Sequence, residues 1–208
     1  MTVCGNCTVF PVIVRITRPE EAIAYRAAFA GCFQDVWSEP PYNQRVYPSE
    51  AEGILLSYLR TPDHITLLVV RGATQVVGFA IGVPAASRPD VIREVRGLVP
   101  IADTFFLAEL GILESWRGNG IGRQLIDLRA SLIDRHRYNQ ALLRVSTAKN
   151  LLYELYRRLG YDDVGLHTEV ASLRTDGSVT TDRRVYLFKS LEAPAERWTS
   201  RRAATPER

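Results

Sequence analysis

The stretch "WRGNGIGRQLID", residues 116–127, places three glycines at alternate positions between two arginines, and a helical pattern follows at once. Ile121, Leu125, Leu128 and Leu132 recur every three or four residues, which predicts one buried stripe along an α-helix. The N-terminus of a helix presents unpaired backbone N–H groups and the positive end of the helix dipole, and glycines let an anion approach them. The stretch therefore predicts either an anion-binding loop or a turn that needs glycine for its backbone angles.

Three familiar glycine motifs do not fit this stretch. The dinucleotide fingerprint GxGxxG needs a third glycine where Arg123 stands, and the phosphate-binding GxxxxGK[ST] needs a lysine. Lys149 and Lys189 are the only lysines of the chain, and neither is near. The nucleophile motif GxSxG is absent as well.

The composition is that of an ordinary globular domain, with 208 residues, 46% hydrophobic and 24% charged. A net charge of +3 is too small to indicate nucleic acid, so no nucleic-acid partner is expected. No apolar run reaches the roughly 18 residues of a membrane span, and residues 1–12 lack the pattern of a signal peptide. We therefore expect no membrane partner and a cytoplasmic protein. The pair Cys4 and Cys7 lacks the other half of a zinc site, so no metal is expected.

Strand and helix patterns alternate along residues 9–191 in the order β-α-α-β-β-(α)-β-α-β-α-β-β. This order predicts a single α/β (α+β) domain, with a mixed sheet of about seven strands and helices on both faces. Residues 1–8 are expected to form a flexible N-terminus, and residues 192–208 a polar, disordered tail. Residues 34–48, between the first two helices, are expected to be irregular.

Two capping boxes are expected at the starts of the first two helices. In a capping box, a side chain at the helix start and one three residues later each bond the other's backbone N–H. Thr17 with Glu20, and Ser49 with Glu52, have this spacing.

The segment "ELGILESWRGNGIGRQLI", residues 109–126, resembles the coenzyme-A-binding motif of the GNAT superfamily of N-acetyltransferases, which reads [QR]xxGx[GA] after an apolar strand. Arg117, Gly120 and Gly122 fill the three motif positions, and Leu110 and Ile112 match the apolar pair before them.

A second segment, "LLYELYRRLGYDDVG", resembles the family's YxxxGF motif through Tyr156, Gly160 and Tyr161. The order of strands and helices also fits the family over residues 9–191. The resemblance implies the GNAT fold, whose central sheet is mixed and mostly antiparallel.

The resemblance further implies an acetyl-CoA-dependent N-acetyltransferase, which moves an acetyl group directly to a primary amine of a small molecule or peptide. Acetyl-CoA would be the co-substrate, and no metal would take part. Two alternatives stay open: a GNAT-fold module that binds coenzyme A without turnover, and a GNAT acyltransferase with a different acyl or aminoacyl donor. The oligomeric state is also open, with a homodimer as one alternative.

In the family, backbone groups of the strand before the loop bond the pantetheine arm, and the loop holds the pyrophosphate. The implied coenzyme-binding residues are Leu110, Gly111, Ile112, Arg117, Gly118, Asn119, Gly120, Ile121, Gly122, Arg123 and Asn150. One departure concerns an asparagine that the family often has seven residues before the tyrosine. Lys149 occupies that position here, and Asn150 is one place late.

Glu109 is the candidate general base. Strand alternation puts it on the face opposite Leu110 and Ile112, and partial burial would raise its pKa. The alternative is a surface salt bridge. Tyr156 is the candidate general acid, because it matches the family's helix tyrosine whose hydroxyl reaches the coenzyme sulfur. The alternative is a packing tyrosine, and Tyr153 lies one turn earlier.

The acceptor is less well specified. In the family, the segment between the first two helices lines the acceptor pocket, and here it offers Asp35 and Glu39 for a cation and Trp37 and Tyr42 for an aromatic wall. The alternative is an aromatic loop packed on the sheet. Residues 85–103 could form another wall.

Overall fold

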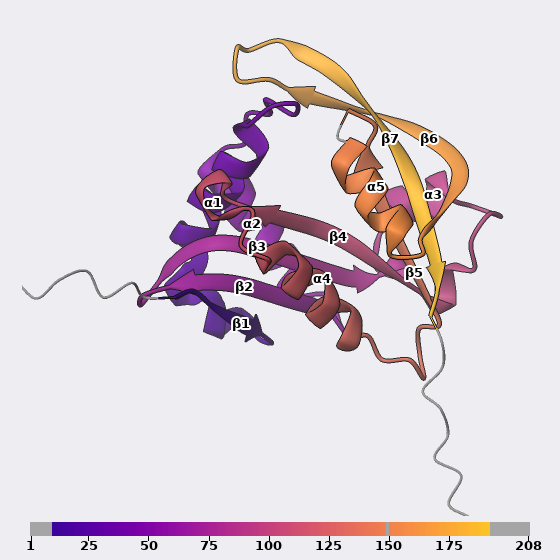
Figure 1. Ribbon diagram of the computed structural model, residues 1–208, viewed down its shortest axis with the longest axis horizontal. Helices are drawn as coiled ribbons and strands as arrows, with labels where there is room; N and C mark the ends of the chain where they lie inside the picture. Colours follow the sequence, from indigo (N-terminus) through magenta and orange to yellow (C-terminus); the bar gives the residue numbers. More distant parts are fainter. Residues whose placement is uncertain (1–9, 149, 192–208) are drawn as a thin grey trace, which may run out of the picture.

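A seven-stranded sheet forms the centre of the molecule, seen in a computed structural model that describes residues 10–148 and 150–191 (Figure 1). The strand order is β1-β2-β3-β4-β5-β7-β6, and only β4 and β5 run parallel. The strands are β1 Val12–Ile16, β2 Ile65–Arg71, β3 Gln75–Pro84, β4 Thr104–Ile112, β5 Gln140–Ser146, β6 Asp162–Leu173 and β7 Val179–Ser190. The predicted mixed, mostly antiparallel sheet is confirmed.

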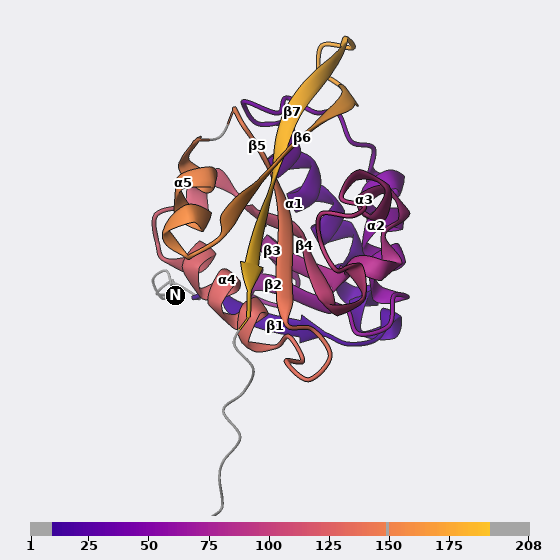
Figure 2. The ribbon, with the colours of Figure 1, turned by 90° about the vertical axis from the view of Figure 1, so that its right-hand side faces the viewer.

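Helices cover both faces of this sheet, as predicted. Figure 2 shows α4 and α5 on one side and α1, α2 and α3 on the other. The α-helices are α1 Arg26–Ser38, α2 Pro48–Leu59, α3 Pro89–Glu94, α4 Ile121–Ser131 and α5 Asn150–Arg158. Short 3-10 helices span Pro19–Tyr25, Ala85–Ser87, Ile101–Asp103 and Glu114–Trp116. Each face has its own apolar core, one around Phe29, Leu55 and Phe79 and the other around Leu125, Ala141 and Leu187.

Some predictions fall outside the described residues. These are the flexible N-terminus with Cys4 and Cys7, the tail over residues 192–208, and Lys149. Within the described part of the chain, no helix is both long and apolar enough to cross a membrane.

The first predicted capping box is wrong by one residue. The backbone N–H of Thr17 donates to Glu21 Oε2 at 2.8 Å, and Glu20 takes no part. The turn that follows, Pro19–Tyr25, is a 3-10 helix, so the α-helical spacing behind the prediction does not apply.

The second predicted capping box is also wrong. Pro48 is the first residue of α2, a position that suits proline because its missing N–H would be unpaired there. The helix therefore starts one residue before Ser49, and the backbone N–H of Tyr47 donates to Glu50 at 3.4 Å. Glu52 instead forms an ion pair with Arg26 at 2.7 Å.

Two further predictions need correction. The segment over residues 34–48 is not irregular throughout, because α1 continues to Ser38. The stripe on α4 is also different: Leu128 is 37% exposed, and Arg129, only 1% exposed, lies among the buried residues of the helix.

The sheet splits between β4 and β5, and this split positions the site. The two strands pair only from Thr104 with Gln140 to Leu107 with Leu143. Beyond that point, β5 continues alongside β7 to Ser146, while β4 continues to Ile112 paired with β3 alone. The last residues of β4 therefore have a backbone edge that no strand occupies.

The long hairpin of β6 and β7 extends past the rest of the sheet toward the end of α1 (Figure 1). The loop after α1 is bonded to it, through Arg45 N to Leu173 O and Thr175 N to Asn43 O, both at 2.8 Å. The hairpin thus encloses the α1 side of the split.

Candidate active site

A groove with a volume of about 680 Å³ follows the free edge of β4. Its walls come from the end of α1, the last residues of β4, the glycine loop and α5. Its lining includes Trp37, Tyr42, Leu110, Gly111, Ile112, Arg117, Gly118, Gly120, Gly122, Arg123, Ile126, Leu152 and Leu155. A groove with one unpaired strand edge can take an extended ligand that hydrogen-bonds like an added strand.

The glycine loop is built for close approach of an anion. Gly118 and Gly120 have φ angles of 79° and 77°, which residues with a side chain rarely adopt, and a Cβ on either would meet nothing within 4 Å. Gly120 caps α4, and the first helical hydrogen bond runs from Gln124 N to Gly120 O at 3.1 Å. The N–H groups of residues 121–123 precede that bond and lie at the positive end of the helix. This arrangement fits a phosphate group.

Eight of the residues expected to bind coenzyme line this groove, namely Leu110, Gly111, Ile112, Arg117, Gly118, Gly120, Gly122 and Arg123. Two do not line it. The Asn119 side chain donates to the Trp116 and Arg117 carbonyls at 3.3 Å, and Ile121 packs in the core at 8% exposed. Asn150 is the first residue of α5, and its side chain lies outside the described structure.

A β-bulge in β4 determines on which face of the sheet the Glu109 side chain lies. Glu109 pairs with Ile81 and Phe106 pairs with Val83, so β4 carries one more residue than β3 across this step. The extra residue leaves Ala108 and Glu109 on one face, while Leu107 and Leu110 pack in the opposite core. Bulges commonly re-aim a side chain next to a site. The sequence pattern predicted the face correctly but not the bulge.

Glu109 accepts a hydrogen bond from the Tyr58 hydroxyl at 3.0 Å. Burial raises the pKa of Glu109 above its usual range, and the hydrogen bond and the nearby arginines Arg88, Arg184 and Arg144 only partly offset this. A raised pKa brings a carboxylate closer to the range in which it can accept a proton from an amine. No carboxylate–cation ion pair holds Glu109 within the described residues, in contrast to the salt-bridge alternative.

Tyr156 is 4% exposed, and its hydroxyl accepts a hydrogen bond from Arg129 Nη2 at 3.2 Å. Arg129 Nη1 donates to the Glu109 carbonyl at 2.7 Å and to the Ile81 carbonyl at 3.0 Å. Arg129 thus bonds both strands at the bulge and links the backbone of the candidate base to the side chain of the candidate acid. In the described part of the chain no acidic side chain pairs with it, which is unusual for a buried arginine.

Sequence reasoning missed Arg129. The available signal was its position four residues after Leu125, where a basic residue falls within a buried helical stripe.

A small cavity of about 50 Å³ is lined by both Glu109 and Tyr156. It shares Leu110 and Leu152 with the groove, and Glu109 with a third cavity of about 200 Å³ on the other side. Trp37 and Tyr42 line all three spaces. The two candidate catalytic side chains therefore both line the small cavity, which shares walls with the groove and with the third cavity. We call the third cavity the acceptor cavity.

The acceptor cavity has an aromatic wall of Phe33, Trp37 and Tyr42, as expected for the last two. The expected acidic residues are not among its lining. Asp35 is exposed on α1, and Glu39 forms an ion pair with Arg117. Residues 85–103 do contribute to the wall, through one side chain, Arg88.

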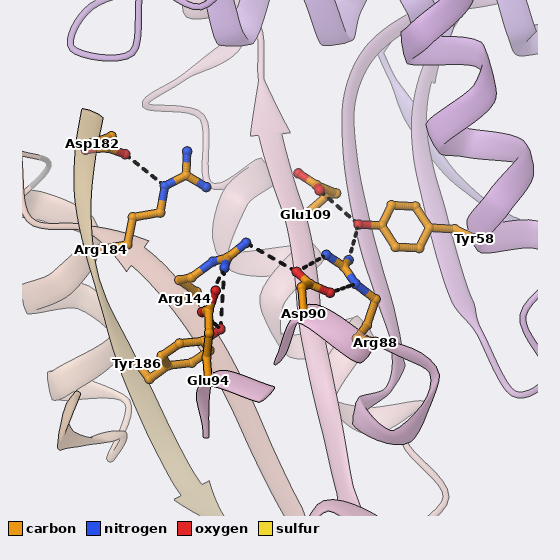
Figure 3. Close-up of polar contacts among 9 residues, drawn as sticks. All are labelled: Tyr58, Arg88, Asp90, Glu94, Glu109, Arg144, Asp182, Arg184 and Tyr186. Carbon is orange, nitrogen blue, oxygen red and sulfur yellow. Dashed lines mark hydrogen bonds and ion pairs between the residues drawn. The ribbon is translucent and has the colours of Figure 1, made fainter. Parts of the chain in front are cut away.

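The basic residues of this cavity, Arg88, Arg144 and Arg184, were not predicted (Figure 3). A signal was available for Arg144, which interrupts the apolar strand "QALLRVS". For Arg88 and Arg184 the sequence offers no such signal. Their position in the cavity depends on how the segment over residues 85–103 and the β6–β7 hairpin fold.

The described residues offer neither a cluster that could hold a metal ion nor a cysteine that lines one of these spaces. No group of three or more His, Cys, Asp or Glu side chains that could hold a metal ion occurs among them. Burial raises the pKa of Cys32 to about 12, and this thiol lines none of the three spaces described above.

Comparison with known proteins places the chain beside acetyltransferases. A sequence profile described as "Acetyltransferase (GNAT) domain" matches residues 63–163. A search of curated protein sequences found no match.

Solved structures give the same picture at low sequence identity. A ribosomal-protein-alanine N-acetyltransferase from Brucella melitensis is 17% identical, with a TM-score of 0.61 over 86% of this chain and 99% of that one. NAA60 from Arabidopsis thaliana, in complex with a bisubstrate analogue, is 14% identical, with a TM-score of 0.57 over 88% and 100%. The protein yncA from Salmonella typhimurium, with its cofactor acetyl-CoA, is 12% identical, with a TM-score of 0.59 over 88% and 96%. At these identities the likeness establishes the fold.

Proposed function

Because this chain belongs to the GNAT family of acetyltransferases, we propose that it transfers an acetyl group from acetyl-CoA directly to a primary amine of a small molecule or peptide. The observation that carries the proposal is the small cavity that Glu109 and Tyr156 line together, which shares walls with the groove and with the acceptor cavity. A base and an acid on the two sides of one reacting centre are what direct acyl transfer to an amine requires.

The groove fits coenzyme A in shape and in donors. No strand pairs with the backbone edge of β4 at Leu110–Ile112, which suits the amide groups of a pantetheine arm, although the Ile112 carbonyl already accepts a hydrogen bond from Arg117 Nε at 2.9 Å. The N–H groups after Gly120 suit a pyrophosphate. Arg123 also lines the groove, and it forms an ion pair with Asp127 at 2.6 Å. When bound there, acetyl-CoA would supply the acetyl thioester.

The chain's own residues would then move two protons. The Glu109 carboxylate accepts a proton from the acceptor ammonium group, which frees the amine to attack. The Tyr156 hydroxyl donates a proton to the departing sulfur. Since Arg129 donates to the Tyr156 oxygen, the hydroxyl proton has to point away from Arg129, and the small cavity is the space beside it. We therefore assign Arg129 a positioning role for Tyr156.

Acetyl-CoA should stabilise the protein far more than NAD or ATP does. A ligand selective for the folded state at about 100 times its Kd adds about 2.7 kcal/mol, which for a domain of this size raises Tm by roughly 5–10 °C. Differential scanning fluorimetry at matched ligand concentrations measures this. Equal stabilisation by NAD would count against a coenzyme A groove.

Tyr156→Phe should lower kcat by roughly tenfold to a hundredfold, because it removes the proton donor while water can substitute in part. It also leaves one buried N–H of Arg129 without its partner, which costs about 1–3 kcal/mol of stability. The matched control is Tyr153→Phe, on the same helix, whose hydroxyl bonds the exposed Asp163 at 3.2 Å. Steady-state kinetics of both variants decide the assignment. Equal kcat values for the two would remove Tyr156 from the mechanism.

The alternatives are separated by following both products. Release of free thiol from acetyl-CoA with a panel of amines, together with mass spectrometry of the acetylated amine, tests for turnover. Binding of acetyl-CoA with no product from any amine would favour a binding module. Co-purified coenzyme that carries a longer acyl chain would favour a different donor.

A further inference from the structure

Three arginines line the acceptor cavity, and Glu109 is the only acidic residue among its described lining. Arg88 comes from the segment before α3, Arg144 from β5 and Arg184 from β7. In Figure 3, the guanidinium groups of Arg144 and Arg184 extend from the β5–β7 side toward the side on which Glu109 lies. The guanidinium groups offer hydrogen-bond donors that a simple amine cannot use, so this wall suits an acceptor that also carries an anionic group.

The three arginines differ in how many of their donors are already used. Arg88 donates from Nε and Nη2 to Asp90, both at 2.9 Å, and from Nη1 to the Tyr58 hydroxyl at 2.8 Å. All three of its nitrogens are engaged, so Arg88 serves the structure of the wall.

Arg184 is different, because only its Nε has a hydrogen-bond partner in the described structure, Asp182 at 2.8 Å. Its two Nη groups make no hydrogen bond there, and neither is among the buried atoms that lack a partner, so both are accessible to solvent. The side chain as a whole is only 13% exposed. The rings of Trp37 and Tyr42, 5.7 and 5.9 Å away, hold its guanidinium in place.

Arg144 also keeps free donors. Its Nη1 donates to Glu94 at 3.2 Å and to the Tyr186 hydroxyl at 3.4 Å. Its Nη2 lies 3.8 Å from Asp90, an ion pair but not a hydrogen bond, and the described structure shows no hydrogen bond from Nε. Arg144 and Arg184 thus present oriented N–H groups to a cavity whose opposite side carries Glu109.

We propose that the acceptor is a small amino acid-like molecule whose carboxylate binds Arg184 and Arg144 while its amino group faces Glu109. This inference rests on the proposed acetyltransferase function and names its substrate class. A carboxylate accepts paired N–H groups of a guanidinium in a fixed geometry, and Arg184 has such a pair free.

The charges behind the arginines favour a single negative charge on the ligand. Asp182 pairs with Arg184, and Asp90 and Glu94 pair with Arg144, so much of the positive charge is already balanced. A monoanionic carboxylate suits this environment better than a dianionic phosphate. The limited volume of about 200 Å³ also favours a small molecule over a folded protein surface.

The test compares amines with and without the carboxylate. Wild-type enzyme and acetyl-CoA are assayed with the common α-amino acids, short ω-amino acids, the matching carboxamides and decarboxylated amines, and aminoalkyl phosphates. The best amino acid should exceed its own carboxamide in kcat/KM by about 10²-fold or more, as expected when a buried charge pair loses one partner.

Variants then locate the recognition. Arg184→Gln should reduce the ratio of amino acid to carboxamide to below about tenfold, mainly by raising KM for the amino acid. Because this change leaves Asp182 without its ion pair, the double variant with Asp182→Asn is measured as well. The control is Arg183→Gln. Arg183 immediately precedes Arg184 on β7, and its exposed side chain points to the other face of the sheet. It should keep the wild-type ratio.

The outcomes separate this inference from the function on which it rests. If carboxamides or simple amines are acetylated as fast as amino acids, the proposed acetyltransferase function stands but the inference about the carboxylate is overturned. The inference is likewise overturned if aminoalkyl phosphates are preferred, or if Arg184→Gln and the double variant both keep the wild-type ratio. Failure to acetylate any amine, with coenzyme still bound, overturns the proposed function itself and the inference with it.

Discussion

Glu109→Gln is expected to lower kcat by about 10²-fold or more, with the affinity for acetyl-CoA nearly unchanged. Glutamine keeps the size of the side chain and can still accept the Tyr58 hydrogen bond, but it cannot take a proton from the acceptor. Glu109 lines the cavities on the acceptor side and is not among the groove's lining residues. Steady-state kinetics, with calorimetric titration of acetyl-CoA, measure both quantities.

The pH profile gives a second readout. The base must be deprotonated, so wild-type kcat/KM should fall as the pH drops through the pKa of Glu109. Since burial raises that pKa, the fall should begin at a higher pH than an ordinary glutamate gives. The glutamine variant should lack this limb and recover in part at high pH, where more of the acceptor is already a free amine.

Glu109→Gln, which should lower activity, is expected to raise stability. The pKa of Glu109 is higher in the folded chain than in the unfolded one, so the stability that Glu109 contributes is present at low pH and is lost as the pH rises through the folded-state pKa. Above that pKa, the neutral glutamine should raise Tm. A variant that is inactive yet more stable cannot owe its loss of activity to unfolding.

The control for this prediction is Glu114→Gln, an exposed position in the 3-10 helix just after β4. It should change neither kcat nor Tm appreciably. If Glu109→Gln also stays within about threefold of wild type, which is less than roughly 0.7 kcal/mol of barrier, Glu109 is not the base.

Local patterns and the resemblance of two short motifs predicted the fold and most of the residues that line the groove beside β4, because both depend on short-range features. The apolar run before the glycines became β4, and the glycines became the cap of α4. Glu109 was placed on the correct face from its two neighbours, Leu110 and Ile112, alone. Errors occurred where one residue moved a boundary, as when Pro48 set the start of α2.

Long-range contacts account for what the sequence did not predict. Arg129 is buried because its guanidinium reaches carbonyls on β3 and β4 that are irregularly paired, and a bulge leaves no periodic signal. Arg88 and Arg184 are about a hundred residues apart and share a cavity only after the hairpin and the segment before α3 have folded around β4. The acidic residues nearest in sequence to the aromatic wall, Asp35 and Glu39, were instead directed to solvent and to Arg117.

Gly120→Val is expected to weaken acetyl-CoA binding by about 10²-fold or more. The Cβ at this position meets no protein atom within 4 Å, and the residue lines the groove, so the added side chain would occupy the space in which a pyrophosphate approaches the N–H groups of α4. Valine is also strained at a φ of 77°, which costs roughly 1–2 kcal/mol of stability. Calorimetric titration of the folded variant measures the affinity.

Backbone strain alone could mimic this result, and Gly177→Val separates the two causes. Gly177 has a φ of 87°, a Cβ there also meets nothing within 4 Å, and it lies in the turn of the β6–β7 hairpin, away from the groove lining. Both variants should lose a similar amount of stability, but only Gly120→Val should lose affinity for acetyl-CoA. If the two variants bind alike, the glycines of the loop serve only the turn into α4, and the anion-binding interpretation of "WRGNGIGRQLID" is wrong. If only Gly120→Val fails to bind, the alternate glycines are there to leave a phosphate room beside the helix.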